Sequence, residues 1–525
     1  MLNAFRLARA GLVLARAGAF SFVAKEDLPP GAVRAVALAR LIEKPALDDA
    51  TRGRRLSDAL NRLGPSYIKL GQFLATRPDI VGPDMAEALS GLKDEIPPFP
   101  TETAKAIIEA NLGRPVPAIF RSFSEPLAAA SIAQVHKAVL ARPDGEATVA
   151  VKVLRPDVRR RFTRDLASFY SAARWMEQFA PEARRLKPVA VVETLHRSVI
   201  LEMDLRLEAA AISEMAENVA EESDFRLPAL AWEVTGRDVL VTEWIDGIKL
   251  RDVARIAAAG HDPKRLAVTV IQSFLRHALR DGFFHADMHE GNLFIDAEGR
   301  LVAVDLGIMG RIGYKERKFL AEILYGFIRR DYRRIAEVHF EAGYVPRIHS
   351  VEDFAQALRA IGEPIHGHRA SDISMAKLLA LLFEITEIFD MQTRPELILL
   401  QKTMVVVEGV ARRLDPDFDM WSAAEPVVSE WVARFVGPHG RLTEIGEGVA
   451  ALSHLVRSLP DLARRIEQIT VNAEAATGDG LKLDPETIRG IGREVARNTR
   501  WGRVAIWVIA LVSAAAGLSV LFDGL

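Results

Sequence analysis

The 525-residue sequence contains no cysteine. The chain can therefore form no disulfide, no thiolate metal site and no thiol nucleophile, a composition typical of a reducing compartment. The sequence also lacks a strong net charge, because 68 lysine and arginine residues oppose 70 aspartate and glutamate residues, giving a formal charge of −2. Without a generally basic surface, nucleic acid is not a predicted partner, and any electrostatic partner must be recognised locally.

A secretory signal peptide is not predicted either, because Arg6, Arg9 and Arg16 interrupt the apolar residues of the N-terminus. This segment is predicted to be an amphipathic helix at a membrane surface or, as an equal alternative, an ordinary helix packed on its own domain. The hydrophobic content of 49% and the charged content of 26% are close to globular averages. The length predicts about three folded units.

One long apolar run lies near the C-terminus. Residues 504–522 carry no charge and, at about 1.5 Å per residue, span roughly 28 Å, close to the thickness of a bilayer core. We expect a single transmembrane helix here, with a buried globular helix as the alternative. Arg497, Arg500 and Arg503 precede the run, so the positive-inside rule predicts that the large domain faces the cytoplasm.

The secondary-structure pattern changes along the chain. Helical periodicity extends to about Pro100, where a run with three prolines ends it. Runs of β-branched residues then predict strands at 135–140, 147–154 and 238–245. A long helical stretch separates the last two strands, so we expect a small sheet that carries one helix. After Gly247 the helical period dominates, and Asp262 opens a helix that Gly282 ends.

The strongest chemical signal is the stretch from His285 to Asn292, followed by an Asp-x-Gly at Asp305. Asp287 precedes Asn292 by five residues, which repeats the order of the catalytic loop and the metal loop of kinases. Phosphoryl transfer needs oxygen ligands that hold Mg²⁺ on the phosphates and one acid that orients the nucleophile. Asn292 and Asp305 are therefore predicted metal ligands, and Asp287 is the predicted catalytic carboxylate.

His285 and His289 lie four residues apart, a spacing that places two zinc ligands on one helical face. A helix is not predicted between Gly282 and Gly291, and no further ligands lie nearby, which argues against zinc. A turn with structural Asp and His residues remains the alternative for any single residue of this stretch. The set as a whole favours the kinase layout.

Upstream, the apolar run 148–153 contains Lys152, as the nucleotide-binding strand of kinases does. A lysine near a strand end is common, so this signal depends on the order of the motifs. A kinase also needs a helical carboxylate that holds the lysine on the phosphates. In the following helical stretch Asp204 and Glu208 share a face and Glu202 does not, and we predict that Glu208 pairs with Lys152.

No GxGxxG loop precedes this strand. An alanine-rich stretch takes its place, with the residues Ala128, Ala129, Ala130, Ser131, Ile132, Ala133, Gln134 and Val135. Alanine restricts the backbone more than glycine, so a loop over the phosphates would be stiffer and would turn fewer amides inward. We assign this stretch, Lys152 and Glu243 of the third predicted strand to nucleotide binding.

With these motifs the chain resembles the UbiB family of atypical, protein-kinase-like kinases and ATPases of ubiquinone biosynthesis. The similarity runs from about Leu63 to Gly310. Three family motifs are matched in order: KxGQ by Lys69-Leu70-Gly71-Gln72, the alanine-rich loop by Ala128 to Val135, and ExD by Glu202-Met203-Asp204. Chance is a poor explanation for three motifs in the family's order.

The resemblance implies an α+β, protein-kinase-like fold with two lobes and an N-terminal helical extension over the active site. It implies that Lys69 reaches the site as a catalytic residue, and that Lys69 and Gln72 lie near Glu202 and Asp204. In the family this lysine pairs with the ExD acids and blocks the channel that a protein substrate would use. Gln72, Glu202, Asp204 and Glu208 are accordingly the predicted ion-pair and regulatory residues. The implied activity is ATP hydrolysis or restricted phosphorylation with Mg²⁺, whereas without the family Lys69 and Gln72 would be solvated helix positions.

The resemblance and the boundary signals together predict six segments. They are an N-terminal amphipathic segment (1–55), a helical extension with the KxGQ motif (56–125), a kinase-like N-lobe (126–247), a kinase-like C-lobe (248–440), a helical juxtamembrane region (441–503) and a transmembrane helix (504–522). The implied location is the bacterial inner membrane, with the kinase-like domain in the cytoplasm. The implied partners are membrane lipid, ubiquinone-biosynthesis enzymes and prenylated quinone precursors.

Three residues depart from the family's pattern, which usually has prolines where Met288 and Glu290 stand and a phenylalanine where Leu306 stands. Bacterial members also commonly carry two C-terminal spans. A nucleotide-binding pseudokinase that organises partner enzymes is the main alternative function. Hydroxylation of a quinone precursor is a third, which no flavin, dinucleotide or metal-oxygenase pattern supports.

A cluster of basic residues follows the lysine strand. Its members are Arg155, Arg159, Arg160, Arg161 and Arg164. The cluster is predicted either to contact anionic lipid headgroups or to form an ordinary solvated helix face.

Overall fold

The fold is taken from a computed structural model. It describes residues 2–22, 40, 42–43, 49–75, 77, 81, 83–90, 92, 96–143, 145–179, 184, 187–367, 385, 388–391 and 395–435. The predicted juxtamembrane region and transmembrane helix, 441–522, lie outside these residues. Within the described residues, no helix is both long and apolar enough to cross a bilayer.

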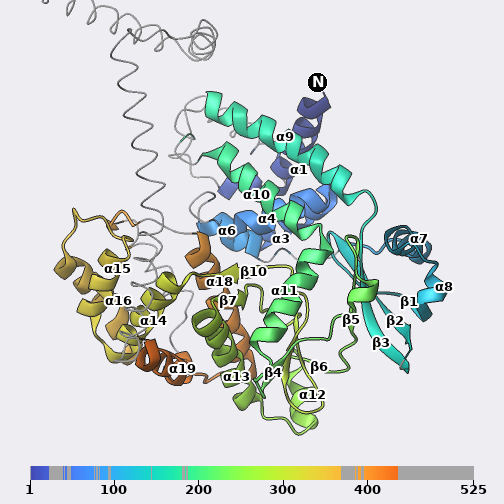
Figure 1. Cartoon of the computed structure of the whole chain (residues 1–525). Coiled ribbons are helices and arrows are strands. Elements are labelled where there is room, and N and C mark those ends of the chain that lie inside the picture. The colour runs from blue at the N-terminus through green and yellow to red at the C-terminus, as the bar shows by residue number, and fades with distance from the viewer. Residues whose placement is uncertain are drawn as a thin grey trace, which may run out of the picture. The chain divides into compact units, whose positions relative to one another are not determined.

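The helices of the N-terminal part pack on one another. They are α1 (Leu2–Ala17), α3 (Asp49–Leu63), α4 (Pro65–Ala75) and α6 (Pro83–Ser90), with a 3-10 turn η1 at Ala19–Phe22. Helix α1 contacts α3 and α9 (Val158–Phe179), and Ala10 is buried in the shared core (Figure 1). The N-terminal helix therefore packs on its own domain, which is the second of the two alternatives that the sequence predicted.

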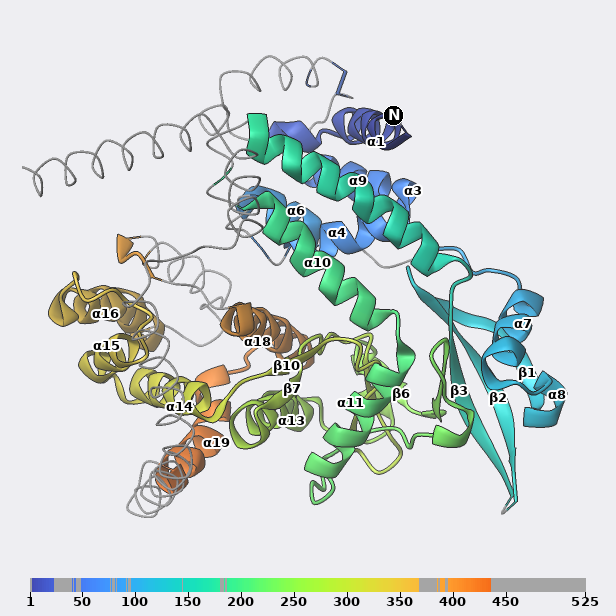
Figure 2. The same ribbon diagram turned by 45° about the horizontal axis from the view of Figure 1, so that its top comes forward.

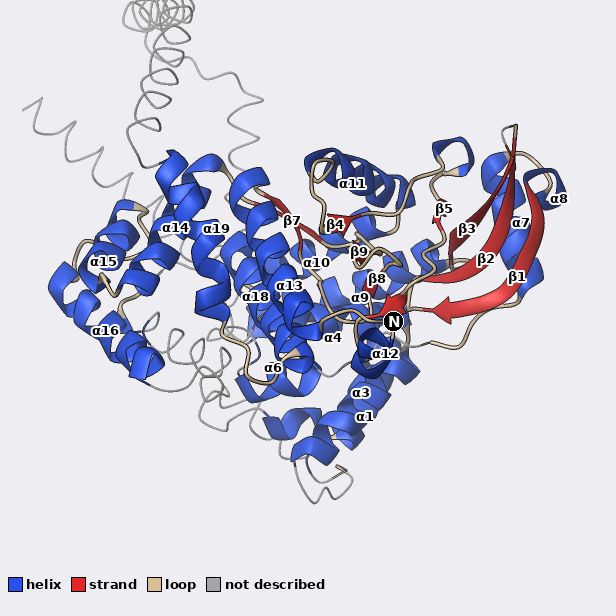
Figure 3. Cartoon of the chain, turned by 90° about the horizontal axis from the view of Figure 1, so that it is seen from below, coloured by secondary structure: helices blue, strands red, loops and turns tan. Residues whose placement is uncertain are grey.

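An antiparallel sheet follows, with the strand order β1-β2-β3-β5 (Figure 3). The strands are β1 (Phe120–Ala129), β2 (Ala133–Arg142), β3 (Gly145–Leu154) and β5 (Val239–Glu243). Strand alternation places Val149, Val151 and Val153 on one face, where they are buried in a core shared with α7 (Thr101–Leu112) and α8 (Val116–Ile119). The opposite face carries Lys152.

The alanine-rich stretch belongs to this sheet and not to a free loop. Ala128 and Ala129 end β1, residues 133–135 begin β2, and only 130–132 form the turn between them. The Ala130 amide donates to the Ala133 carbonyl at 2.8 Å. The sequence prediction missed β1, which begins inside the predicted helical extension, because its pairing is irregular around Pro126, a residue that only an edge strand tolerates.

Helices α9, α10 (Pro188–Glu202) and α11 (Leu205–Asn218) connect β3 to β5, where the sequence predicted one helix. Helix α9 packs along α10, and both contact α4 (Figure 2). The break before α11 has a local cause, because the Asp204 side chain accepts a hydrogen bond from the Arg206 amide and caps the new helix. Only one of these three helices, α11, contacts β5 to a marked extent.

Short strands form the boundary with the helical part. Strands β4 (Phe225–Arg226), β9 (Leu301–Ala303), β8 (Leu293–Ile295) and β6 (Ile248–Lys249) pair in that order, and β7 (Phe283–His285) pairs with β10 (Met309–Arg311). A 3-10 turn η3 lies at Trp232–Val234. The loops that carry Asp287 and Asp305 follow β7 and β9, so these strands fix the positions of both predicted motif loops.

The helical part begins with α12 (Val253–Ala258) and α13 (Pro263–Arg276), which Asp262 caps as predicted. A π turn at His277–Asp281 extends α13, and Gly282 ends it at φ +68°, also as predicted. A side chain at Gly282 would meet the Ile312 carbonyl at 2.5 Å. The remaining helices are α14 (Tyr314–Arg329), α15 (Tyr332–Glu341), α16 (Val351–Gly367), α18 (Pro395–Leu414) and α19 (Met420–Phe435). Helices α18 and α19 both pack on α13.

The predicted α+β architecture, with a sheet part followed by a helical part, is confirmed. The six segment boundaries remain predictions.

Candidate active site

The candidate site centres on Lys152, which β3 presents on the open face of the sheet. Its Nζ lies 2.9 Å from both carboxylate oxygens of Glu208 on α11 and 3.1 Å from Oδ1 of Asp305 after β9. The structure thus brings together three predicted site residues from distant parts of the chain. Glu208 is buried, whereas the Asp305 side chain is 48% exposed.

The charges of this group are interdependent. Burial raises the pKa of Glu208 to about 7, although the Lys152 ammonium opposes that shift. Partial loss of hydration also opposes ionisation of the half-exposed Asp305, but Lys152 and the Gly307 amide outweigh it and lower the pKa of Asp305 to about 2. Burial on its own would lower the pKa of Lys152. The carboxylates of Asp305 and Glu208 outweigh that effect, so the pKa of Lys152 lies above its ordinary value. A proton added to the group therefore goes to Glu208, the less hydrated carboxylate.

The backbone fixes the orientation of Asp305. Its φ is +68°, a left-handed conformation that aspartate tolerates better than most residues. Its Oδ1 accepts a hydrogen bond of 3.2 Å from the Gly307 amide. The Asp-x-Gly sequence thus turns the carboxylate toward Lys152.

The predicted catalytic loop is a turn tied to the strand before Asp305. The side-chain amide nitrogen of Asn292 donates to the Asp287 carbonyl at 3.2 Å, and the Val304 amide donates to the Asn292 carbonyl at 2.8 Å. With its Nδ2 engaged, Asn292 has its Oδ1 left for a cation. Asp287 is partly exposed at this turn.

His285 supports this loop from inside. It is fully buried, and burial lowers its pKa to about 4, so the ring is neutral at pH 7. Its Nδ1 accepts a hydrogen bond of 3.0 Å from the Asp287 amide, which places the proton on Nε2. Nε2 of His289 lies 3.7 Å from Oδ2 of Asp287. In the described part of the chain, no three His, Asp or Glu side chains are arranged as a metal site, so no zinc site is found there.

The three departures from the family pattern have definite places. Met288 and Leu306 are buried, at 0% and 1% exposure. Glu290 forms an ion pair with Arg413 of α18. Burial and an ion pair therefore restrain this loop, in which the family's usual prolines are absent.

Lys69 of α4 forms an ion pair with Glu202, the last residue of α10, and both side chains are largely buried. Asp204 instead pairs with Arg206 at 2.7 Å, and this contact lowers its pKa. Gln72 lies three residues after Lys69, and among the described residues no hydrogen bond joins it to Glu202 or Asp204. The predicted pairing of Lys69 with Glu202 is therefore present, and the places of Gln72 and Asp204 beside them stay predictions.

The alanine-rich stretch divides between the two faces of the sheet. Val135 is paired with Lys152, and Ala128 with Val135, so these side chains share the face of Lys152. Gln134 lies on the opposite face, where its side chain bonds the amide and the carbonyl of Phe99 at 2.9 and 3.1 Å. Residues 131–134 are buried. The prediction that all eight residues reach a nucleotide is therefore wrong for the Gln134 side chain, because successive residues of a strand face opposite sides.

Arg155 has a structural role that its sequence position did not indicate. Its guanidinium donates to the carbonyls of Ala130, Pro97 and Ile96 at 2.8, 3.0 and 3.1 Å. It thereby ties the hairpin turn to the proline-rich segment before the sheet. Arg159 pairs with Asp238, and Arg161 donates to a backbone carbonyl. Of the basic cluster, Arg160, Arg161 and Arg164 are exposed.

Glu243 is also tied to other protein groups. Its carboxylate accepts hydrogen bonds from Arg226 at 3.0 Å and from the Ala229 amide at 3.1 Å. Arg226 also binds Asp296 at 2.8 Å. This network joins β5 to the small sheet, so the Glu243 side chain holds the two parts together. Its assignment to nucleotide binding stays a prediction.

The remaining groups fit Mg·ATP. Asp305 and Asn292 offer hard oxygen ligands on adjacent, hydrogen-bonded segments, and Mg²⁺ usually takes one or two carboxylates together with phosphate oxygens. Lys152 offers a fixed cation for phosphate. The half-exposed Asp305 carboxylate is accessible to a cation, whereas Glu208 behind the lysine is not.

The fold and this group of residues define a kinase-like protein. A family model described as ABC1 atypical kinase-like domain matches residues 91–339, and one described as UbiB helical domain matches 358–419. The chain is 42% identical to a probable protein kinase UbiB from Marinobacter nauticus, over 75% of this chain and 73% of that protein. It is 39% identical to a probable protein kinase UbiB from Pseudomonas fluorescens, over 80% and 79%. The chain therefore belongs to the UbiB family, which confirms the resemblance seen in its motifs.

Among solved structures, a complex of Rv3197 with erythromycin from Mycobacterium tuberculosis aligns at a TM-score of 0.48 and 23% identity. The alignment covers 75% of this chain and 98% of that one.

Proposed function

We propose that the protein is a membrane-anchored atypical kinase or ATPase that uses Mg·ATP and supports ubiquinone biosynthesis. The observation that carries this proposal is the position of Lys152 between Glu208 and Asp305. This arrangement combines a phosphate-binding cation, the carboxylate that holds it and a metal ligand, which are the groups that phosphoryl transfer requires. Membership of the UbiB family supports the ubiquinone pathway.

Each residue has a separate role in this proposal. Lys152 donates hydrogen bonds to phosphate oxygens while Glu208 holds its ammonium group in place. Asp305 and Asn292 hold the cation through their side-chain oxygens. Asp287 orients the attacking hydroxyl or water by accepting its hydrogen bond. When bound, Mg·ATP supplies the transferable phosphoryl group.

The ion pair between Lys69 and Glu202 supports the restriction of this activity to water or small substrates. It joins the N-terminal α4 to the end of α10, which directly precedes α11 and its Glu208. The proposed location is the bacterial inner membrane, anchored by residues 504–522 with the kinase-like part in the cytoplasm. Ubiquinone-biosynthesis enzymes, prenylated quinone precursors and anionic lipid at Arg160 and Arg164 are the proposed partners.

Steady-state ATP hydrolysis by the full chain in detergent or nanodiscs tests the proposal. We expect turnover that requires Mg²⁺ and falls at least about a hundredfold in Asp287→Asn. A side reaction of a contaminating ATPase would persist in this variant. Nucleotide binding without any turnover would contradict an enzymatic function and favour the alternative, a pseudokinase scaffold.

A further inference from the structure

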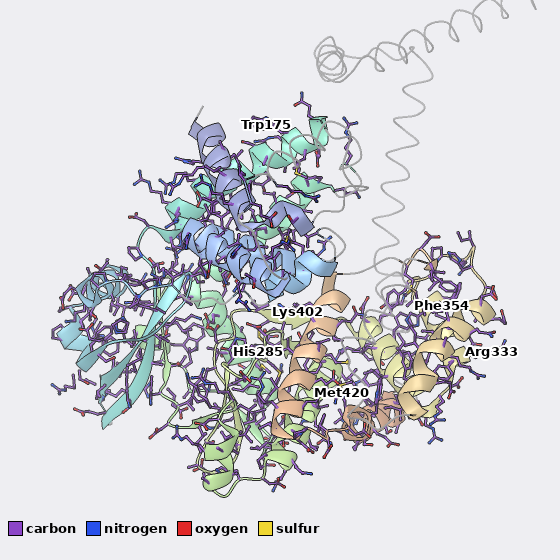
Figure 4. All side chains as sticks on the ribbon, turned by 180° about the vertical axis from the view of Figure 1, so that it is seen from behind. Trp175, His285, Arg333, Phe354, Lys402 and Met420 are labelled. Atoms are coloured by element: carbon purple, nitrogen blue, oxygen red, sulfur yellow. The ribbon has the colours of Figure 1, made fainter. Side chains whose placement is uncertain are left out.

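Helix α18 contacts the predicted catalytic loop at two points, although the two segments are far apart in the sequence. The Thr403 hydroxyl is fully buried and lies 3.1 Å from the Ala286 carbonyl, as well as 2.8 Å from the Leu399 carbonyl of its own helix. Ala286 immediately precedes Asp287. Ten residues further along α18, Arg413 pairs with Glu290, on the other side of Asp287. Figure 4 shows His285 beside this helix.

The contact of Thr403 acts on one peptide plane. The carbonyl of Ala286 and the amide of Asp287 belong to the same planar unit. The Asp287 amide donates to Nδ1 of His285 at 3.0 Å, while the Ala286 carbonyl faces the Thr403 hydroxyl. The plane is therefore held at both edges, which limits the rotation that would move the Asp287 side chain.

The neighbouring helices hold the chain that leads into the loop in the same way. In the π turn after α13 the regular hydrogen-bond ladder is interrupted, which leaves carbonyls to be paired elsewhere. Trp431 of α19 donates to the Leu279 carbonyl at 2.8 Å, and Arg317 of α14 donates to the Arg280 carbonyl at 2.5 Å. Side chains from α14, α18 and α19 thus hold the approach to Asp287.

Contacts with other segments restrain the loop at the two positions where this chain lacks the family's usual prolines. A proline fixes its own φ and stiffens a loop without outside help. Where the family usually has prolines, this chain has Met288, which is buried at 0% exposure, and Glu290, which binds Arg413. In this chain, burial of Met288 and the ion pair of Glu290 restrain the loop in place of the fixed φ angles of prolines.

We propose that Thr403 is a positioning residue for Asp287, and that the Glu290–Arg413 ion pair is a second restraint on the same loop. Thr403 and Arg413 lie in the region matched by the UbiB helical domain, whereas Asp287 lies in the kinase-like domain. The helical domain then serves catalysis by fixing the loop and without contacting the nucleotide. The catalytic part of this inference rests on the proposed function.

Two substitutions at position 403 separate positioning from packing. Thr403→Val keeps the shape and removes the hydroxyl, while Thr403→Ser keeps the hydroxyl. In the full chain we expect Thr403→Val to lower kcat for Mg·ATP hydrolysis about tenfold with little change in nucleotide affinity, because only the alignment of Asp287 is lost. We expect Thr403→Ser to retain most of the rate.

The matched control is Thr194→Val. Thr194 bonds the carbonyl four residues earlier in its own helix, as Thr403 does, but it is exposed. Its replacement should leave kcat unchanged. Equal losses of kcat in Thr403→Val and Thr403→Ser, or a parallel loss of kcat and nucleotide affinity, would overturn the positioning role.

Hydrogen exchange of the peptide covering residues 283–292 provides a readout that does not need turnover. We expect exchange there to rise about tenfold in Thr403→Val and to rise also in Glu290→Gln, since each change removes a restraint that keeps the loop closed. Exchange in β2 and β3 should stay the same. Unchanged exchange of 283–292 in both variants would refute the inference, even in a chain that hydrolyses ATP. Faster exchange in a chain without turnover would instead refute the proposed enzyme and leave the restraint established.

Discussion

The Gln134 side-chain amide forms two hydrogen bonds with the backbone of Phe99, one to its amide and one to its carbonyl. This pairing joins the proline-rich segment to strand β2 on the face of the sheet opposite Lys152. Arg155 joins the same segment to the hairpin turn. On this face the alanine-rich motif therefore anchors the proline-rich segment to the sheet.

Gln134→Leu is expected to lower the free energy of unfolding by about 2 kcal/mol, because it leaves the buried amide and carbonyl of Phe99 without partners. Urea unfolding followed by tryptophan fluorescence measures this. Nucleotide affinity of the folded variant should stay near the wild-type value. A large loss of affinity with unchanged stability would restore the direct nucleotide contact that the sequence predicted.

Asp305→Asn is expected to abolish the stabilisation of the protein by Mg·ATP. A ligand at a hundred times its Kd stabilises the folded state by about 2.7 kcal/mol, and this gain disappears when binding is lost. Thermal unfolding with and without Mg·ATP tests the effect. Asp296→Asn is a suitable comparison, since Asp296 binds arginines and not Lys152. An Asp305→Asn protein that Mg·ATP still stabilises fully would remove Asp305 from the site.

Lys152→Met is expected to destabilise the protein more at pH 8 than at pH 6. The substitution leaves Glu208 buried without its cation, a loss of about 3 kcal/mol when the carboxylate is charged. The pKa of Glu208 is already raised to about 7 by burial, so protonation relieves the penalty at lower pH. Denaturant midpoints at the two pH values check this prediction. The double change Lys152→Met with Glu208→Gln should recover most of the stability at pH 8, and no recovery would contradict the pairing.

A fourth prediction concerns the pH dependence of stability. Burial lowers the pKa of His339 on α15 to about 4. A histidine with a lowered folded-state pKa contributes stability that is complete above its unfolded pKa of about 6.5 and is lost as the pH falls through about 4. His339→Phe should therefore make the decline of stability between pH 6.5 and 4 shallower, while it keeps the ring contacts with Phe354 and Tyr344. An unchanged decline would show that His339 is not buried as a neutral ring.

The sequence was most informative where function depends on a few closely spaced residues. The spacing of Asp287, Asn292 and Asp305 predicted two loops that the structure connects through hydrogen bonds. The preference for Glu208 as the partner of Lys152 matches the contact that the structure contains. Both followed from chemistry that demands fixed residue types.

Other features could not be read from the sequence because they depend on long-range packing. The helix break at Asp204 separates Glu202 from Glu208, and it arises from a single capping hydrogen bond within an otherwise helical pattern. The face of Gln134 depends on the register of β2 against β3. Thr403 lies 117 residues from Ala286. No local pattern marks such a partner.

The contact between Lys152 and Asp305 has a thermodynamic consequence. A cation that binds Asp305 must compete with the ammonium group, and a phosphate that binds Lys152 must compete with the carboxylate. Each ligand therefore releases the group that the other needs, so the two should bind with positive cooperativity, and the coupling energy must be the same in both directions. The lysine and the aspartate together would favour the metal–nucleotide complex over either component alone, and so discriminate against free Mg²⁺ and against metal-free ATP.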